Sequence, residues 1–192
     1  RSMDLAAPVG LGQRGLLVVP AQASTTGLLT ELAAAITVNN PEAHLMVVLT
    51  DALPEVVTQL QRTVHGEVIA ASFDRAAEDQ TTVAELAIDR ARRLVELGHD
   101  VVVLLDSLNR LARAYAQTQP GAAKVATDVV DEYAIGQVKK LLAAARNLEN
   151  GGSLTILATA QTKTGVAVDK TLLREVRQVV NNEVRFSRTA VG

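Results

Sequence analysis

The 192-residue chain contains no cysteine and no tryptophan, and it has only two phenylalanines and two tyrosines. The lack of cysteine excludes disulfides and thiolate metal sites. The shortage of aromatic rings leaves little for nucleic-acid bases to stack on. The net charge of −2 argues against a broad nucleic-acid footprint but leaves room for a local basic patch.

Long apolar runs are lacking as well. The sequence has no stretch long enough to span a bilayer and no signal peptide, so we expect a cytoplasmic protein without membrane contacts. Its three histidines, His44, His65 and His99, show no metal-ligand spacing with acidic neighbours.

Alanine, valine, leucine and isoleucine carry almost all of the 48% hydrophobic share. This bias suits buried parallel strands beneath Ala- and Leu-rich helices, and the length suits one domain with a full-sized core. We assign residues 10–192 to a single domain and residues 1–9 to an N-terminal segment. Within that segment Arg1 and Ser2, ahead of Met3, resemble a cloning remnant.

Short apolar runs alternate with longer segments of helical pattern. Strands are predicted at residues 16–19, 44–50, 67–71, 101–106 and 154–160, and helices at 26–38, 54–64, 82–97 and 131–148. Residues 179–186 are predicted to add one or two edge strands. The alternation predicts an α/β domain with a mainly parallel, twisted sheet flanked by helices.

The loop after the first predicted strand has the position of a phosphate-binding loop but not its chemistry. Such a loop needs glycines whose backbone N–H groups surround phosphate, a lysine for the β- and γ-phosphates, and Ser or Thr for Mg²⁺. Aligned on Thr26, the loop carries Val19 and Ser24 at the glycine positions and Thr25 at the lysine position. Taken alone, the segment is better explained as a strand, a turn and a helix capped by Ser or Thr.

A second pattern is the apolar run that ends in Asp106. Four or more apolar residues followed by Asp form the Walker-B pattern, in which the carboxylate holds Mg²⁺ directly or through water. The pattern is weak by itself, because Asp106 or the following Ser107 would also serve as a helix N-cap.

Several segments in a fixed order carry a family resemblance. They are residues 12–18, 58–62, 66–68, 104–107, 110–115, 144–147 and 151–155. Their order and spacing closely resemble the RecA-type ATPase domain of bacterial transcription termination factor Rho, from about Gly10 to Arg188. The resemblance implies a RecA-like P-loop NTPase fold and a relation to the RNA-dependent ATPase and helicase of transcription termination.

The departures from the Rho pattern fall where that family does chemistry. Two lysines and a glycine of its phosphate loop, its catalytic Glu and a neighbouring Arg correspond here to Gln22, Thr25, Ser24, Ala52 and Leu53. Losing one preorganised donor costs roughly 10²–10³ in rate. The combined loss predicts a degenerate Walker A site, no catalytic residue and no ATP hydrolysis.

What remains is a vestigial nucleotide site made of Gln22, Ser24, Thr25, Thr26 and Asp106. Thr26 and Asp106 would hold a metal only if Mg-nucleotide binds. Asp51 precedes the lost Glu position, but adjacent positions along a strand point to opposite faces. We therefore assign no cofactor and expect Mg-ATP to bind weakly at best.

Three arginines and two loops complete the candidate residues. Arg110, Arg113 and Arg146 are candidates for interface or phosphate contacts, and structural ion-pair roles are equally open. The resemblance places RNA contacts in two pore loops, where this chain offers Lys124, Val125 and Lys163. The paired glycines of the first loop fall on Asp128 and Val129, and the RNA-contacting lysine of the second falls on Ala167. A carboxylate in such a loop is unfavourable for RNA, so we expect RNA binding to be weak or nil.

Three functions are compatible with these residues. The preferred one is a catalytically silent Rho-like domain that acts as a binding or assembly module, through a protein partner or self-association. Asp106 and Thr26 keep open a divergent, active RNA-stimulated ATPase. The helix N-terminus at Thr26 also keeps open a nucleotide- or anion-binding protein without turnover.

Overall fold

A mainly parallel sheet forms the middle layer of the domain. The computed structural model describes residues 9–21, 23–119 and 132–187. The strands are β1 (Arg14–Pro20), β2 (His44–Ala52), β3 (Glu67–Ser72), β4 (Val101–Asp106), β5 (Arg146–Asn147), β6 (Ser153–Thr162) and β7 (Asn182–Arg185). Their order is β3-β2-β4-β6-β1-β7, with β5 beside β6. Only the β5–β6 pair is antiparallel among these described strands, so the predicted α/β class is confirmed.

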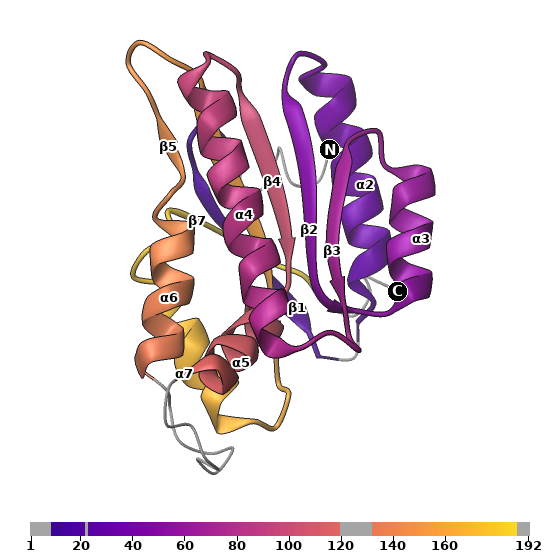
Figure 1. The fold of residues 1–192 in the computed structure, drawn as a ribbon, viewed down its shortest axis with the longest axis vertical. Coiled ribbons are helices and arrows are strands. Elements are labelled where there is room, and N and C mark those ends of the chain that lie inside the picture. Colours follow the sequence, from indigo (N-terminus) through magenta and orange to yellow (C-terminus); the bar gives the residue numbers. More distant parts are fainter. Residues whose placement is uncertain (1–8, 22, 120–131, 188–192) are drawn as a thin grey trace.

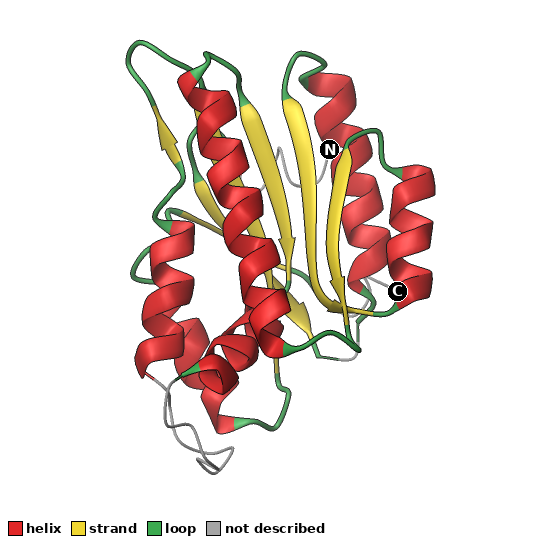
Figure 2. Cartoon of the chain, in the orientation of Figure 1, coloured by secondary structure: helices red, strands yellow, loops and turns green. Residues whose placement is uncertain are grey.

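Helices cover both faces of this sheet (Figures 1 and 2). They are α2 (Thr25–Asn39), α3 (Pro54–Thr63), α4 (Ala77–Glu96), α5 (Leu108–Thr118), α6 (Glu132–Leu142) and α7 (Ala167–Val176). One hydrophobic core joins the sheet to α4, α5, α6 and α7, and a second joins it to α2 and α3.

Strand residues supply the two cores in alternation. In β2, Met46 and Val48 belong to the core beneath α4–α7, whereas Val47 and Leu49 belong to the core beneath α2 and α3. Successive side chains of a strand point to opposite faces, and here both faces are covered. A continuous apolar run is therefore the expected sequence of such a strand.

One predicted helix was too long. The prediction of a helix over residues 131–148 was wrong beyond Leu142, where α6 ends. Arg146–Asn147 instead forms β5 and pairs with Ser153 and Leu154 of β6. Local propensity favours continuing the helix through three alanines, but Ala144 and Ala145 are buried in the core and the chain turns back there. Gly151 and Gly152 belong to that turn and do not terminate a helix.

Two helices were not predicted. In α5 the apolar positions Leu108, Leu111, Ala112 and Tyr115 are buried, and their spacing is the signal that identifies this helix. Helix α7 begins at Ala167, a position that the family resemblance assigned to the second pore loop. The remaining elements agree within a few residues; α4 begins earlier than predicted, at Ala77, and residues 179–186 contain the single strand β7.

Gly152, in the turn before β6, has no room for a larger residue. A Cβ added at Gly152 would collide with the backbone of His99. We predict that Gly152→Ala lowers the free energy of unfolding by about 1–3 kcal/mol, the usual cost of forcing extra volume into a packed site. Gly136→Ala is the matched control, because no atom lies within 4 Å of its added Cβ; it should stabilise α6 by about 0.5–1 kcal/mol. Chemical denaturation measures both, and equal effects would contradict the packing argument.

Candidate functional site

Polar side chains from five neighbouring elements meet at the carboxyl edge of the sheet. In parallel α/β sheets this edge is where ligands bind. Asp106 ends β4, Thr50 lies in β2 and Thr159 in β6, the two strands on either side of β4. Thr25 begins α2, after the loop that follows β1, and Arg110 lies in α5. We call Thr25, Thr50, Asp106, Arg110 and Thr159 the strand-end cluster.

The carboxylate of Asp106 is the centre of this cluster. Asp106 is 2% exposed. Its Oδ2 accepts hydrogen bonds from the Thr25 hydroxyl at 3.0 Å and from Nη2 of Arg110 at 3.0 Å. Its Oδ1 accepts a short hydrogen bond from the Thr159 hydroxyl. Both oxygens of the Walker-B residue therefore already have donors from the chain itself.

Arg110 supplies the charge that balances this carboxylate. Besides Asp106, its guanidinium donates to the backbone oxygens of Thr50 at 3.3 Å and Asp51 at 3.1 Å. Its Nε donates to the hydroxyl of Ser107, the N-cap of α5, at 3.2 Å. The Arg110 side chain is only 22% exposed. Arg110 therefore links the end of β2 to the end of β4. These contacts are those of a structural ion pair.

Two backbone N–H groups of the loop before α2 are hydrogen-bonded within the chain, one to β6 and one to the end of β1. The backbone N–H of Ala21 donates to the carbonyl of Thr162 at 2.9 Å, and that of Ala23 donates to the carbonyl of Pro20 at 3.0 Å. Ser24 occupies the N-cap of α2, but its side chain makes no capping hydrogen bond, so the expected Ser cap is wrong in that detail. Thr26 is half-buried, and its hydroxyl has no hydrogen-bond partner among the described residues.

The end of β2 places Ala52 in the core and leaves its neighbours outside. Ala52 is buried, whereas Asp51 and Leu53 are exposed. Asp51 has a left-handed backbone, with φ of 52°, and its N–H donates to Oε1 of Gln80 at 2.6 Å. The Asp51 carboxylate thus does not occupy the position of the Ala52 side chain.

The other candidate residues do not join the strand-end cluster. Arg113 pairs with Asp169 of α7 at 2.7 Å. Arg146 is exposed in β5 and pairs with Leu154 near the start of β6, at the opposite edge of the sheet from the strand-end cluster. Lys163 is exposed just after β6. Gln22, Lys124, Val125, Asp128, Val129 and the side chain of Ala167 lie outside the described part of the structure.

Sequence reasoning missed three buried polar residues that contact the candidate residues. Thr50 and Thr159 are fully buried and Asp169 is 2% exposed. Thr50 and Thr159 each follow an apolar run in a strand next to β4. A hydroxyl near the carboxyl end of such a strand could have indicated a contact with Asp106. Asp169 had no such signal, because its partner Arg113 lies 56 positions away in the chain.

Three ionisable groups outside the cluster have shifted pKa values. Burial raises the pKa of Tyr115, and its hydrogen bond to Glu85 at 2.9 Å adds to this effect. Burial opposes ionisation of Glu183, but hydrogen bonds from Arg177 and Arg185 outweigh it and lower the pKa. The Ser72 hydroxyl lowers the pKa of the Asp74 carboxyl. Each of the three groups has its hydrogen-bond partner within the chain.

In the described parts of the chain, no group of three or more His, Cys, Asp or Glu side chains is arranged to hold a metal ion. The same residues include no helix that is both long and apolar enough to cross a membrane.

The parallel sheet, its two helical layers and the Asp at the end of β4 define a RecA-like domain of the P-loop NTPase class. The family model of the ATP synthase alpha/beta family, nucleotide-binding domain, matches residues 1–190, and the chain belongs to this family. The matched range includes residues 1–9, which were predicted to form an N-terminal segment outside the domain.

Curated relatives extend this result to transcription termination factor Rho. The Rho proteins of Micrococcus luteus and Pseudomonas aeruginosa are 55% and 50% identical to this chain over 188 residues, or 98% of its length. Those residues make up 27% and 45% of the two relatives, so the chain spans between a quarter and a half of their length. The recognised homology to the Rho ATPase domain is confirmed.

A solved structure supports the fold alone. It is that of a prototypical ATPase from the type III secretion system of pathogenic bacteria, with a TM-score of 0.82 and 20% identity. The similarity covers 98% of this chain and 55% of that one.

The contacts of Asp106 predict a difference between two adjacent threonines. Thr25→Val removes a donor from a buried carboxylate, and we expect it to lower the free energy of unfolding by about 1–3 kcal/mol. Thr26→Val is the matched control, and its effect should stay within about 0.5 kcal/mol. Urea denaturation of both variants provides the comparison. A Thr26→Val effect as large as that of Thr25→Val would refute the assigned contact.

Proposed function

We propose that this chain is a Rho-like RecA-fold domain that does not hydrolyse ATP and acts as a binding or assembly module. The observation that carries the proposal is the set of donors around Asp106. The residue whose pattern is that of a metal-binding carboxylate has its hydrogen bonds satisfied by Thr25, Thr159 and Arg110.

The residues of the strand-end cluster do not fit Mg-nucleotide. A Mg²⁺ ion needs oxygen ligands and retains several waters, but Oδ2 of Asp106 faces the guanidinium of Arg110. Thr25, at the position of the phosphate-binding lysine, is neutral, buried and directed at that same oxygen. Binding a metal here would require breaking the contacts that keep Asp106 buried.

The remaining parts of a phosphate site are weakened as well. Two loop N–H groups, those of Ala21 and Ala23, are used within the chain. Phosphoryl transfer depends almost entirely on positioning and electrostatic stabilisation. Ala52 offers neither charge nor hydrogen bond at the position of the water-orienting Glu. The loss of these groups together supports a domain that kept the fold without the chemistry.

If the domain assembles with a partner protein, the contact has to depend on the packing of side chains and not on Arg110 or Arg113. The Arg110 guanidinium is held within the chain, and Arg113 is paired with Asp169. Exposed ion pairs contribute only about 0–1 kcal/mol each, so neither arginine alone would hold a neighbour. We propose that contacts with a partner protein are mainly apolar and that RNA binding is weak or nil.

Nucleotide turnover tests the first part of the proposal. We expect phosphate release from Mg-ATP at the background rate, with or without single-stranded RNA, because the charged groups for phosphoryl transfer are replaced. Micrococcus luteus Rho serves as the active control and Asp106→Asn as the matched variant, after circular dichroism has established its folding. Robust release that Asp106→Asn abolishes would overturn the proposal. Tight Mg-independent nucleotide binding without release would favour a nucleotide-binding protein instead.

The oligomeric state tests the assembly part. We predict a monomer or small oligomer at micromolar concentration, because stable interfaces usually bury at least about 1,000 Å² in total and nucleotide is not expected to bridge subunits. Size exclusion with light scattering, with and without Mg-nucleotide, measures the mass directly. A hexamer that forms only with Mg-nucleotide would restore the active ATPase interpretation.

A further inference from the structure

Two of the three histidines come together at the amino edge of the sheet. His44 begins β2, and His99 lies just before β4. Their ring centres are 4.6 Å apart, and the ring planes are inclined at 80°. Strands β2 and β4 are neighbours and both begin at the top of Figure 1, whereas the strand-end cluster lies where the strands end. The histidine pair is therefore separate from that cluster.

The backbone holds both histidines in place. The N–H of His44 donates to the carbonyl of Asp100 at 2.8 Å, and the N–H of His99 donates to the carbonyl of Leu94 at 3.1 Å. Gly152 lies so close to the backbone of His99 that an added Cβ would collide with it. The spacing of the two residues is thus set by the sheet and its connections, not by the contact between the rings.

Both imidazole rings are open to solvent. His44 and His99 are exposed, and within the described residues neither ring makes a hydrogen bond or an ion pair. The carboxylate that follows in the sequence, Asp100, is already engaged, because its Oδ1 accepts hydrogen bonds from the N–H and the hydroxyl of Ser153 at 3.0 and 2.7 Å. The rings can therefore turn about their side-chain bonds without losing a partner.

The spacing of the rings suits a chelated metal ion. In histidine sites the metal lies about 2.0–2.1 Å from a ring nitrogen, and therefore roughly 3.2 Å from the ring centre. Two rings that meet the ion at an angle of about 90–110° then have their centres roughly 4.5–5.2 Å apart. The observed 4.6 Å lies in this range. Rotation of the exposed rings would direct one nitrogen of each to the same ion with no change in the spacing of the strands.

We propose that His44 and His99 form a two-histidine site for a divalent late transition-metal ion such as Cu²⁺ or Zn²⁺. Imidazole nitrogen is a preferred ligand of these ions, whereas Mg²⁺ and Ca²⁺ prefer oxygen. The described residues supply no third side chain, so water would complete the coordination. Cu²⁺ should bind more tightly than Zn²⁺, as it does at most nitrogen sites. The site lies at the opposite edge from Asp106 and does not depend on whether the domain hydrolyses ATP.

Calorimetric titration of the untagged protein with Cu²⁺, Zn²⁺ and Mg²⁺ tests the site. We expect one Cu²⁺ or Zn²⁺ per chain and no binding of Mg²⁺ at this site. His44→Ala and His99→Ala should each weaken Cu²⁺ binding at least about tenfold, because loss of even an indirect partner of a metal ligand costs about 10–100-fold. His65→Ala is the matched control, since His65 is also exposed but has no ring partner. It should leave the affinity unchanged.

Electron paramagnetic resonance of the Cu²⁺ complex supplies a second readout. The spectrum should show coupling to two imidazole nitrogens in the unmodified protein and to one in each of the two variants. Circular dichroism establishes that every variant is folded. Absence of Cu²⁺ binding, wild-type affinity in His44→Ala or His99→Ala, or an equal loss in His65→Ala would overturn the proposal. None of these measurements involves nucleotide, so their failure is distinguishable from failure of the ATPase prediction.

Discussion

The buried carboxylate of Asp106 constrains the residues around it more than any other group in this domain. Burying a charged group is costly unless it is paired and hydrogen-bonded. Here Thr25, Thr159 and Arg110 provide the partners. Each comes from a different element, so β4, β6, α2 and α5 must keep their relative positions for the carboxylate to remain satisfied. The same contacts that stabilise the sheet edge also occupy the atoms that a metal would need.

The positive charge of Arg110 balances the negative charge of the buried Asp106 carboxylate. Its guanidinium joins the Asp106 carboxylate to the last carbonyl groups of β2. Removing one partner of a buried ion pair typically costs about 3–5 kcal/mol, because the other charge is left behind. The neutral Thr25 hydroxyl completes this network by donating to the same oxygen of Asp106 that Arg110 contacts.

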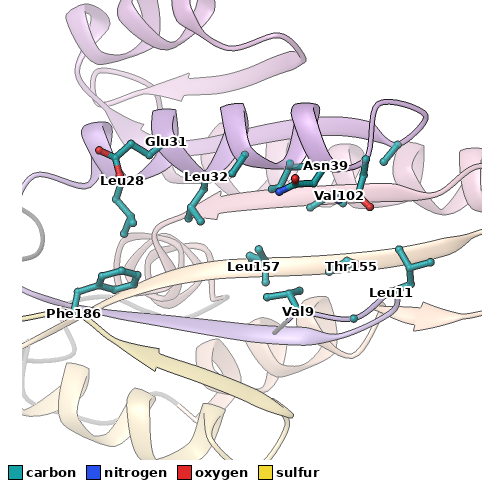
Figure 3. A pocket seen from close by; sticks show the side chains of 15 residues that line it. Val9, Leu11, Leu28, Glu31, Leu32, Asn39, Val102, Thr155, Leu157 and Phe186 are labelled. Carbon is teal, nitrogen blue, oxygen red and sulfur yellow. The ribbon is translucent and has the colours of Figure 1, made fainter. Parts of the chain in front are cut away.

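The two faces of the sheet are covered by different numbers of described helices. Four helices and one large core cover the first face, while α2 and α3 leave part of the second face to a groove lined by Leu28, Leu157 and Phe186 (Figures 2 and 3). At the carboxyl edge, the Asp106 carboxylate has hydrogen-bond donors from the chain itself, and no described helix lies over the groove.

Sequence alone determined every described strand except β5 and most of the helices, because apolar runs such as residues 101–105 are specified locally by the need for burial on both faces. It also determined which charged groups are lacking from the phosphate loop. Tertiary structure decided the end of α6 at Leu142, where pairing of β5 with β6 overrides the propensity of three alanines. It also decided the partners of Asp106, since Thr25 and Thr159 lie 81 and 53 positions away in the chain. Periodicity describes which face a residue takes, but only the packing of strands and helices brings distant hydroxyl groups to one carboxylate.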